Sequence, residues 1–537
     1  MLTISQILSK YGPALSSNIA GRLCRGGLSP DAARQRLSRL PDGVLALRGI
    51  SFPKRVRFIY LESQWGTEAF WSALIEAIKA TNPPYAAAIA AMQARGGVVP
   101  ARHFAIVSGS PVRQARQVAS DVVLERLSAI QLLGRADIAG EGECVLLNEY
   151  AEAAQANRHS LRARLLTEKV LLDAMRQWAG RMNMASPIAT RIRDEEPAPQ
   201  FATFKFDLCG PSYLRSLTRM QDGKLSPGFL VADVVLGATL DEGGVAPFLR
   251  KCEMLGYLKK VRPFVPLLIS DNFTPEALNL CRAKGIMATR PATLFGDDVA
   301  RALGDLLQTL SNAAAVAAAN PERLENIFNR LMSIEGAAGN LRGALFELIV
   351  GHLVKEIVGG SIDIGLNVVD PKTGGAAEID VRLVKQREIA IYECKGYQPA
   401  SEVGGDEIED WLTRQVPRIR GYHKNEQRFR DCELTFEFWT CGSFSADALR
   451  LLTEAATKTK KYTITWKDGK AVRKFAQRLV APGIRKILDE HYFDHPVAKL
   501  KLGGKASTKR PGAEGSAQQA TLRVHSRGRV QSYVHGV

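Results

Sequence analysis

The sequence predicts a multidomain protein, with an α+β unit at its N-terminus and two α/β domains behind it. A chain of 537 residues is too long for a single hydrophobic core. Its 46% hydrophobic and 24% charged residues are typical of globular domains that each bury their own core. Helices lead into short strands up to about residue 150, whereas strands and helices alternate from about residue 190 onward.

No segment has the pattern of a targeting or membrane-spanning element. Met1 is followed by Leu-Thr-Ile-Ser-Gln, without the basic and apolar regions of a signal peptide. No apolar run reaches the roughly 18–20 residues that span a bilayer. The eight cysteines are scattered without a CxxC pair, which favours a reducing compartment over a disulfide framework or a structural zinc site. We therefore expect a cytoplasmic protein with no membrane partner.

Basic residues are concentrated at the two ends of the chain. The net charge of +17 and the pI near 9.5 indicate a polyanionic partner only weakly. Residues 1–62 hold ten Lys and Arg against three acidic residues, a net charge of +7. The segment from Lys501 onward holds seven against one, a net charge of +6. Because residues 499–537 contain few large apolar side chains, we expect a disordered basic tail there.

Residues 1–62 predict three helices followed by a two-stranded ribbon. The third helix, at 30–39, begins after Ser29, which is a good N-cap, and carries a proline at its first position. Two β-prone segments follow, at 44–50 and 56–61, joined by a short basic turn.

This order of elements resembles a winged helix-turn-helix. The resemblance makes the third helix the recognition helix, makes the basic turn the tip of the wing, and implies double-stranded DNA as a partner. A solvated basic face that contacts nothing is the alternative. The side chains assigned to DNA binding are Arg34, Arg36, Arg39, Lys54, Arg55 and Arg57.

Residues 66–150 repeat this plan with a weaker pattern. Three helical segments and one β-like piece are expected, at 67–80, 85–95, 112–127 and 143–147. We interpret them as a second winged-helix-like domain. A helical connector rich in Ala, Leu and Arg should follow at 151–189.

The C-terminal part of the chain carries an ordered set of charged residues. Glu347 lies in a helix that is apolar on nearly every side, where an ionised carboxylate is costly unless it is paired or bound to a cation. A place at the helix edge, open to solvent, is the alternative for this residue. Asp380 lies on a strand two residues after Glu378, and Glu393 and Lys395 lie two apart at the end of the next strand. Each strand pair therefore shares one face of the sheet.

A helical Glu, then an Asp on a strand, then Glu-x-Lys on the next strand resembles the PD-(D/E)xK nuclease superfamily. This restriction-endonuclease-like group includes the Mrr-like and Holliday-junction-resolvase branches. The resemblance spans residues 340–480 and implies an α/β nuclease domain at 340–498 that depends on Mg²⁺ or Mn²⁺. The proline of the family's name is absent, since Glu378 and an isoleucine precede Asp380.

What the resemblance implies can be placed residue by residue. Asp380 and Glu393 correspond to the metal ligands, and Mg²⁺ is indeed held in proteins by one or two carboxylates plus water. Lys395 corresponds to the group that orients or activates the attacking water. Glu347 corresponds to the helix carboxylate that completes the metal site.

Residues 190–310 have a similar α/β outline without this set of residues. Strand-like segments at 201–208 and 229–236 precede a helix, and Asp233 could stand where the metal-binding Asp stands. No Glu-x-Lys follows it on a strand. We interpret this region as a degenerate nuclease-like domain, joined to the last domain by a helical linker at 311–339. An unrelated α/β domain is an equally good interpretation.

The sequence thus predicts a DNA endonuclease directed to duplex DNA by its winged helices. A non-catalytic DNA-binding regulator or assembly subunit is the alternative, and the complete four-residue set favours the enzyme. RNA cleavage is less favoured, because no RRM or KH motif is present. Analogy with the fold group points to antiviral and anti-plasmid defence in bacteria. One complete set per chain predicts a homodimer, and any ATPase or other defence subunit would be a separate partner, because the chain has no Walker motif.

Overall fold

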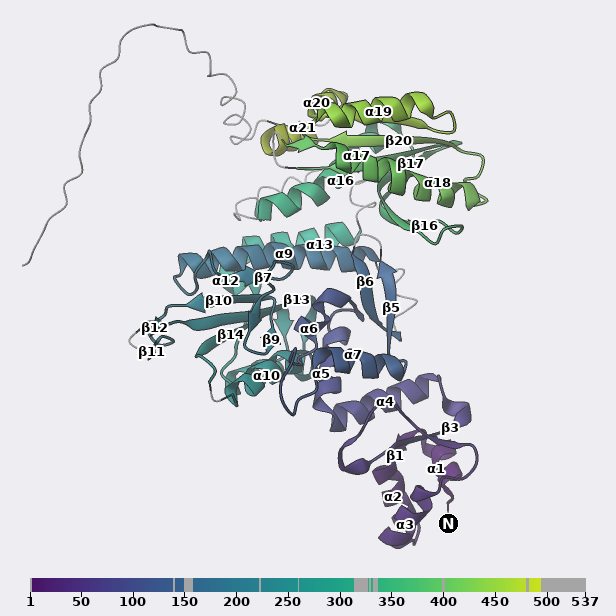
Figure 1. Cartoon of the computed structure of the whole chain (residues 1–537), viewed down its shortest axis with the longest axis vertical. Coiled ribbons are helices and arrows are strands. Elements are labelled where there is room, and N and C mark those ends of the chain that lie inside the picture. The colour runs from purple at the N-terminus through teal and green to yellow at the C-terminus, as the bar shows by residue number, and fades with distance from the viewer. Residues whose placement is uncertain are drawn as a thin grey trace, which may run out of the picture.

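The computed structural model describes residues 2–138, 141–148, 158–221, 224–258, 260–312, 327, 330–331, 337–397, 401–479 and 482–493. Most of the expected linker at 311–339 and the whole expected tail at 499–537 lie outside these residues. No helix in the described ranges is long and apolar enough to cross a membrane. Figure 1 shows the N-terminal unit at one end of the molecule, the C-terminal domain at the other, and the rest of the chain between them.

The N-terminal unit consists of three helices and a three-stranded sheet. Its third helix begins as expected, because the Ser29 hydroxyl accepts a hydrogen bond from the N–H of Ala32 at 3.3 Å. The sheet has one strand more than expected, since Ala14 and Leu15 pair antiparallel to the last strand. The elements are α1 (Ile4–Tyr11), β1 (Ala14–Leu15), α2 (Ser16–Arg25), α3 (Pro30–Ser38), β2 (Val44–Ala46), η1 (Pro53–Arg55), β3 (Phe58–Leu61) and η2 (Glu62–Gln64), with strand order β1-β3-β2.

The second unit also has a three-stranded sheet, in the order β4-β6-β5. The helix expected to start at residue 112 starts only at Ser120. The segment before it is held elsewhere, because the N–H of Val112 donates to the carbonyl of Thr203 at 2.8 Å and Arg116 has a φ of +62°. The elements are α4 (Glu68–Thr81), α5 (Pro83–Gln93), β4 (Val98–Pro100), η3 (Ala101–His103), α6 (Phe104–Val107), α7 (Ser120–Ala129), β5 (Leu133–Ile138) and β6 (Gly142–Leu147).

The middle domain is built on a five-stranded mixed sheet. The expected connector is the long helix α9 (Arg158–Arg181), which packs on the central strand β13 (Gly228–Leu240) and therefore belongs to this domain. The expected strand at 201–208 is mostly a hairpin outside the sheet, formed by β8 (Gln200–Phe201) and β9 (Phe204–Lys205). The remaining elements are β7 (Arg191–Ile192), β10 (Leu208–Ser212), β11 (Arg219–Gln221), β12 (Lys224–Ser226), α10 (Glu242–Gly256), β14 (Phe264–Phe273), α11 (Pro275–Ala283), β15 (Met287–Thr289), α12 (Pro291–Phe295) and α13 (Asp297–Ser311).

In the C-terminal domain, the helix α16 (Ala337–Val358) is followed in the chain by a second five-stranded sheet. Helices are apolar all round when they are buried, and Leu345 to Val354 of α16 are almost completely enclosed. The other elements are β16 (Ser361–Val369), β17 (Ala376–Lys385), β18 (Glu388–Lys395), β19 (Glu402–Val403), α17 (Gly405–Asp410), η5 (Trp411–Gln415), α18 (Val416–Asn425), β20 (Glu433–Thr440), β21 (Ser443–Phe444), α19 (Ala446–Lys458), β22 (Thr463–Lys467), α20 (Gly469–Ala476), α21 (Pro482–Leu488) and η6 (Asp489–Phe493).

The two five-stranded sheets have the same topology. The order is β7-β10-β13-β14-β15 in the middle domain and β16-β17-β18-β20-β22 in the C-terminal domain. In both, the first three strands pair antiparallel and the last two add on in parallel, with helices on the crossovers. The helices that precede the two sheets, α9 and α16, pack against each other within one hydrophobic core (Figure 1).

Candidate active site

The predicted site lies where two strands of the C-terminal sheet separate. The antiparallel pairing of β17 with β18 ends at Val381 and Tyr392, so Asp380 and Glu393 are the next residues on the open side. There the Asp380 carboxylate accepts the backbone N–H of Cys394, with Oδ2 at 2.7 Å from the nitrogen. Buried N–H groups require a partner, and this side chain supplies it where the ladder has ended. Asp380 is thereby fixed in orientation.

Glu393 and Lys395 form an ion pair beside it. The Lys395 Nζ lies 2.7 Å from Oε1 of Glu393, and the Glu393 side chain is 13% exposed. Burial raises the pKa of Glu393 to about 7, and the negative charge of Asp380 adds to this effect. Burial alone would lower the pKa of Lys395, but Glu393 and Asp380 raise it above its usual value. At neutral pH the lysine is therefore a cation next to a carboxylate that is only partly ionised.

Glu347 lies close to the same group of acidic residues. It is buried on α16, 8% exposed, so the alternative of a solvent-exposed helix edge does not hold. Burial raises its pKa well above the usual value, Arg162 opposes that shift, and the charge of Asp380 adds to it. The structure thus brings together all four residues of the predicted set.

Two further charged residues at this site were not predicted. Arg162, from α9 of the middle domain, donates to Oε1 of Glu347 at 2.8 Å and also to the Glu378 carboxylate. Arg162 could not be singled out from the sequence, because one arginine in a helix rich in them looks like part of a solvated face. The strand pattern places Glu378 on the same face as Asp380 but assigns it no role.

A cavity of about 550 Å³ opens onto Arg162, Glu347 and Lys395, whereas Glu378, Asp380 and Glu393 lie behind its lining. Its volume is within the range of sites for small molecules. Three separate parts of the chain enclose it. Arg102 of the second unit lies 2.9 Å from Asp194 and 3.3 Å from Glu141, and all three line the cavity. The other lining residues include Arg162 and Lys169 of α9, Glu347 of α16, and Lys395 with Tyr397 at the end of β18.

The donor chemistry of this site fits a hard divalent cation. In the part of the chain that the structure describes, no three His, Cys, Asp or Glu side chains are arranged as a ready-made metal cluster. Mg²⁺ does not require three, since it keeps several waters and is commonly held by one or two carboxylates together with substrate phosphate. Asp380 and Glu393 provide two carboxylates on neighbouring strands, and the charge of Asp380 contributes to the raised pKa of Glu393.

The residues predicted to bind DNA lie in the N-terminal unit, at the opposite end of the molecule from this site (Figure 1). Those of α3 and of η1 are exposed, and Lys54 and Arg55 adopt positive φ angles of 56° and 58° in the turn. Arg57 differs, because its guanidinium donates to the carbonyl of Leu37 and so ties the last strand to the end of α3. The exposed members are Arg34, Arg36, Arg39, Lys54 and Arg55.

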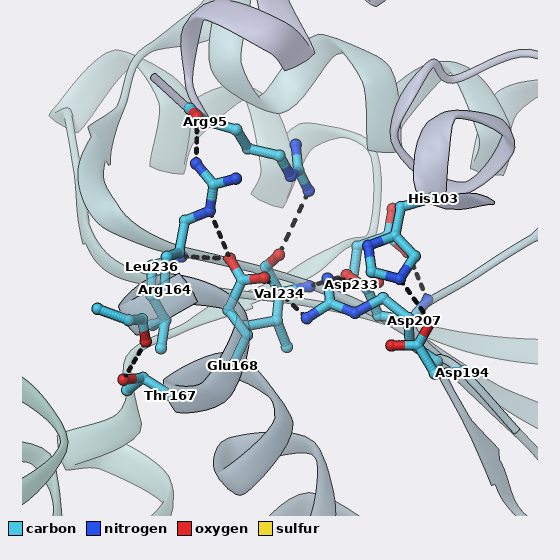
Figure 2. A network of polar contacts seen from close by, with 12 residues as sticks. Arg95, His103, Arg164, Thr167, Glu168, Asp194, Asp207, Asp233, Val234 and Leu236 are labelled. Atoms are coloured by element: carbon cyan, nitrogen blue, oxygen red, sulfur yellow. Dashed lines mark hydrogen bonds and ion pairs between the residues drawn. The ribbon is translucent and has the colours of Figure 1, made fainter. Parts of the chain in front are cut away.

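The middle sheet contains a second group of acidic residues at the corresponding place. The pairing of β10 with β13 ends at Leu208 and Ala232, so Asp207 and Asp233 come next on the open side. The Asp207 carboxylate accepts the backbone N–H of Val234 at 2.8 Å, as Figure 2 shows. Both the register and the hydrogen bond repeat those of the C-terminal sheet.

This correspondence corrects the interpretation of Asp233. Asp207, not Asp233, takes the place of Asp380, and Asp233 takes the place of Glu393. Spacing alone could not reveal this, because the expected strand at 201–208 hid the start of β10. Two residues after Asp233 stands Val235, where the C-terminal domain has its lysine.

The acidic residues of the middle sheet are paired with buried cations. Arg193 lies 2.8 Å from the Glu168 carboxylate of α9 and 3.2 Å from Asp207. Lys251 of α10 lies 2.5 Å from Asp233. All five side chains are at most 5% exposed. Figure 2 shows Glu168, Asp207 and Asp233 within one continuous polar network.

Comparisons with known proteins gave only distant similarities. No protein-family model matches the chain, and no curated protein matches it. Among solved structures, the restriction endonuclease MspJI in complex with a 27-mer oligonucleotide is 15% identical, with 36% of this chain and 39% of that chain covered and a TM-score of 0.17. The restriction endonuclease FokI is 11% identical, with 86% and 82% covered and a TM-score of 0.19, and FokI bound to DNA is 10% identical, with 82% and 76% covered and a TM-score of 0.18. This chain thus spans well under half of the MspJI chain.

Proposed function

We propose that the protein is a metal-dependent DNA endonuclease whose active site consists of Asp380, Glu393, Lys395 and Glu347. One observation carries the proposal: a half-buried Lys–Glu ion pair lies beside a fixed Asp carboxylate where two strands part, and its lysine lines a cavity. The ion pairs of the middle domain, formed by Arg193 and Lys251 with their carboxylates, do not reach this cavity.

Asp380 and Glu393 would hold Mg²⁺ or Mn²⁺. One carboxylate oxygen of Asp380 accepts the N–H of Cys394, which leaves the other oxygen for a cation. Glu393 is oriented by Lys395, which contacts only its Oε1. When bound, the metal ion lowers the pKa of a coordinated water and neutralises charge that develops on the phosphate.

Lys395 would position the attacking water and the scissile phosphate. An ammonium group has three N–H donors, and Glu393 takes one of them. The other two can donate to a water molecule and to a non-bridging phosphate oxygen. Because the pKa of this lysine is held above its usual value, it stays charged throughout and acts by orientation and charge, not by removing a proton.

The N-terminal unit would deliver double-stranded DNA. Its three helices and three-stranded sheet have the element order of a winged helix, and its exposed basic side chains lie on α3 and on the η1 turn. Basic side chains that contact phosphates supply most of the salt-dependent affinity for DNA. By analogy with the nuclease fold group, the proposal includes a role in defence, with an ATPase or other subunits as partners.

The direct test is cleavage by the purified full-length protein. Supercoiled plasmid, linear duplex and single-stranded DNA should be incubated with Mg²⁺, with Mn²⁺ and with EDTA. We expect cleavage of at least one of them with either metal and none with EDTA. Cleavage that persists in EDTA, or in a Glu393→Gln variant, would show that the chemistry is elsewhere.

A further inference from the structure

We propose that Arg162 acts as a built-in cation of the active site and limits it to one divalent ion, held by Asp380 and Glu393. This inference rests on the proposed function and deepens it. It assigns a role in the nuclease site to a residue of the middle domain, and it predicts how many metal ions the site takes.

Arg162 lies among the carboxylates of the C-terminal site and interacts electrostatically with Asp380. Its guanidinium joins Glu347 on α16 to Glu378 on β17, two carboxylates from different elements of the other domain. A guanidinium fork matches carboxylates well and stays charged at every relevant pH, so it can neutralise both. Arg162, Glu347 and Lys395 all line the same cavity.

The charges at this site leave room for one divalent ion. Four carboxylates interact here, those of Glu347, Glu378, Asp380 and Glu393, and two cations accompany them, Arg162 and Lys395. With all groups ionised the balance is −2, which one Mg²⁺ or Mn²⁺ cancels. A second ion would leave an excess of positive charge in a partly buried site, which is unfavourable.

The middle domain supplies an independent comparison. There, too, an arginine joins the carboxylate on the preceding helix to one on the sheet, since Arg193 contacts Glu168 and Asp207. Lys251 neutralises the remaining carboxylate, that of Asp233. Arg164 of α9 is a third cation, 3.8 Å from Glu168. Three carboxylates and three cations balance to zero, so this group should take no metal. Charge balance thus predicts no bound metal ion for the middle domain and one for the C-terminal domain.

The assignment also determines which carboxylates bind the metal. With Glu347 and Glu378 held by Arg162, the remaining carboxylates are those of Asp380 and Glu393. Glu347 would then act as a positioning residue through Arg162, not as a direct ligand.

The test counts Mn²⁺ ions on the full-length protein without DNA, by calorimetric titration and by electron paramagnetic resonance. The ions that belong to the site are those that no longer bind in a Glu393→Gln variant. We expect one for the wild type and two for Arg162→Met, where two Mn²⁺ ions roughly 3.5–4 Å apart would give a spin-coupled signal. Arg162→Lys keeps the positive charge and should keep one ion.

Arg176→Met is the matched control. Arg176 lies on the same helix and also joins two carboxylates, those of Asp173 at 2.8 Å and Glu195 at 2.6 Å, but it does not line the cavity. It should leave the count at one. Two ions in the wild type, or one in a folded Arg162→Met variant, would overturn the role of Arg162. An ion count that Glu393→Gln leaves unchanged would instead count against the proposed metal-dependent nuclease itself.

Discussion

Asp380 and Asp207 hold equivalent positions in two sheets of the same chain, and each fixes the neighbouring strand in the same way. Asp380 accepts the N–H of Cys394 at 2.7 Å, and Asp207 accepts the N–H of Val234 at 2.8 Å. The two sites differ in what surrounds these aspartates. The C-terminal site opens onto a cavity and keeps a lysine two residues beyond its glutamate, whereas the middle site is closed and filled by its own cations.

Replacing Lys395 or Asp380 should abolish cleavage while leaving DNA affinity within a few-fold. In the proposed function both residues act on the metal and the water, and neither lies in the basic N-terminal unit, so the rate of the chemical step should fall by at least about a hundredfold. Plasmid cleavage and duplex binding by fluorescence anisotropy would measure the two effects. Lys467→Ala is the matched control, because Lys467 forms a 2.7 Å pair with Glu437 on the same sheet but does not line the cavity. Cleavage at the wild-type rate by both Lys395→Ala and Asp380→Ala would mean that the site is misassigned.

Metal affinity should rise with pH up to about 7 and then level off. A raised pKa means that the folded protein favours the protonated form of Glu393. The free energy of unfolding therefore falls as the pH rises from the ordinary carboxyl range to about 7, and Glu393 causes no further loss above that pH. Because a metal ligand must be ionised, Mn²⁺ affinity should fall by nearly tenfold per unit below pH 7. Mn²⁺ titrations at pH 6, 7 and 8 would measure this. An affinity that is flat over that range would contradict the shift.

Removal of Asp233 should cost stability and leave cleavage unchanged. Asp233→Ala leaves the buried ammonium of Lys251 without its counter-ion, in contact with the carbonyl of Lys205 at 2.9 Å and with the rings of Phe206 and Phe248. Breaking such a pair costs about 3–5 kcal/mol, which thermal unfolding would reveal. The double variant Asp233→Leu/Lys251→Met removes both charges and should recover most of that loss. If folded Asp233→Ala protein no longer cuts DNA below its unfolding temperature, the middle domain is not catalytically silent.

The salt dependence of duplex binding should locate the DNA contacts in the N-terminal unit. Each basic side chain that binds a phosphate contributes about 0.9 to the slope of log K against log salt, so its removal should flatten the slope by that amount. We expect this for Arg34→Ala, Arg36→Ala and Lys54→Ala. Arg301→Ala is the matched control for Arg34, since both arginines are exposed and paired with an aspartate three residues earlier in a helix. An unchanged slope after deletion of residues 1–62 would rule out this surface.

The oligomeric state should decide whether the product is nicked or linear. Within the described residues, each chain has one set of the proposed catalytic residues, and the middle domain packs through α9 against α16 of the C-terminal domain, in the manner of an internal partner. A monomer should therefore nick plasmid, and double-strand cleavage should require a homodimer with two Lys395 sites. Fractions separated by size would be assayed for nicked and linear plasmid. Linear product formed directly by a dilute monomer, without a nicked intermediate, would be inconsistent with one active site per chain.

Much of the fold could be predicted because local patterns determine it. Ser29 as an N-cap, the wholly apolar run around Glu347 and the hydrophobic approach to Glu393 each depend on neighbours within a few residues. Errors arose where distant contacts override local preference. The helix expected from residue 112 is delayed because Val112 bonds to Thr203, and the strand expected at 201–208 gives way to a hairpin.

The sequence by itself determined the four residues of the candidate site, because a helix and two strands carry them at spacings that any sheet of this kind brings to one edge. Only the tertiary structure decided which charges accompany them. Arg162 reaches Glu347 across 185 residues, and Arg193 reaches Glu168 across 25, through packing that no local pattern encodes. Charge–charge energies depend on distance and burial, and both are set by how α9 and α16 pack together. The tertiary structure therefore distinguishes an acidic cluster beside a cavity from one whose charges the buried cations of the same chain neutralise.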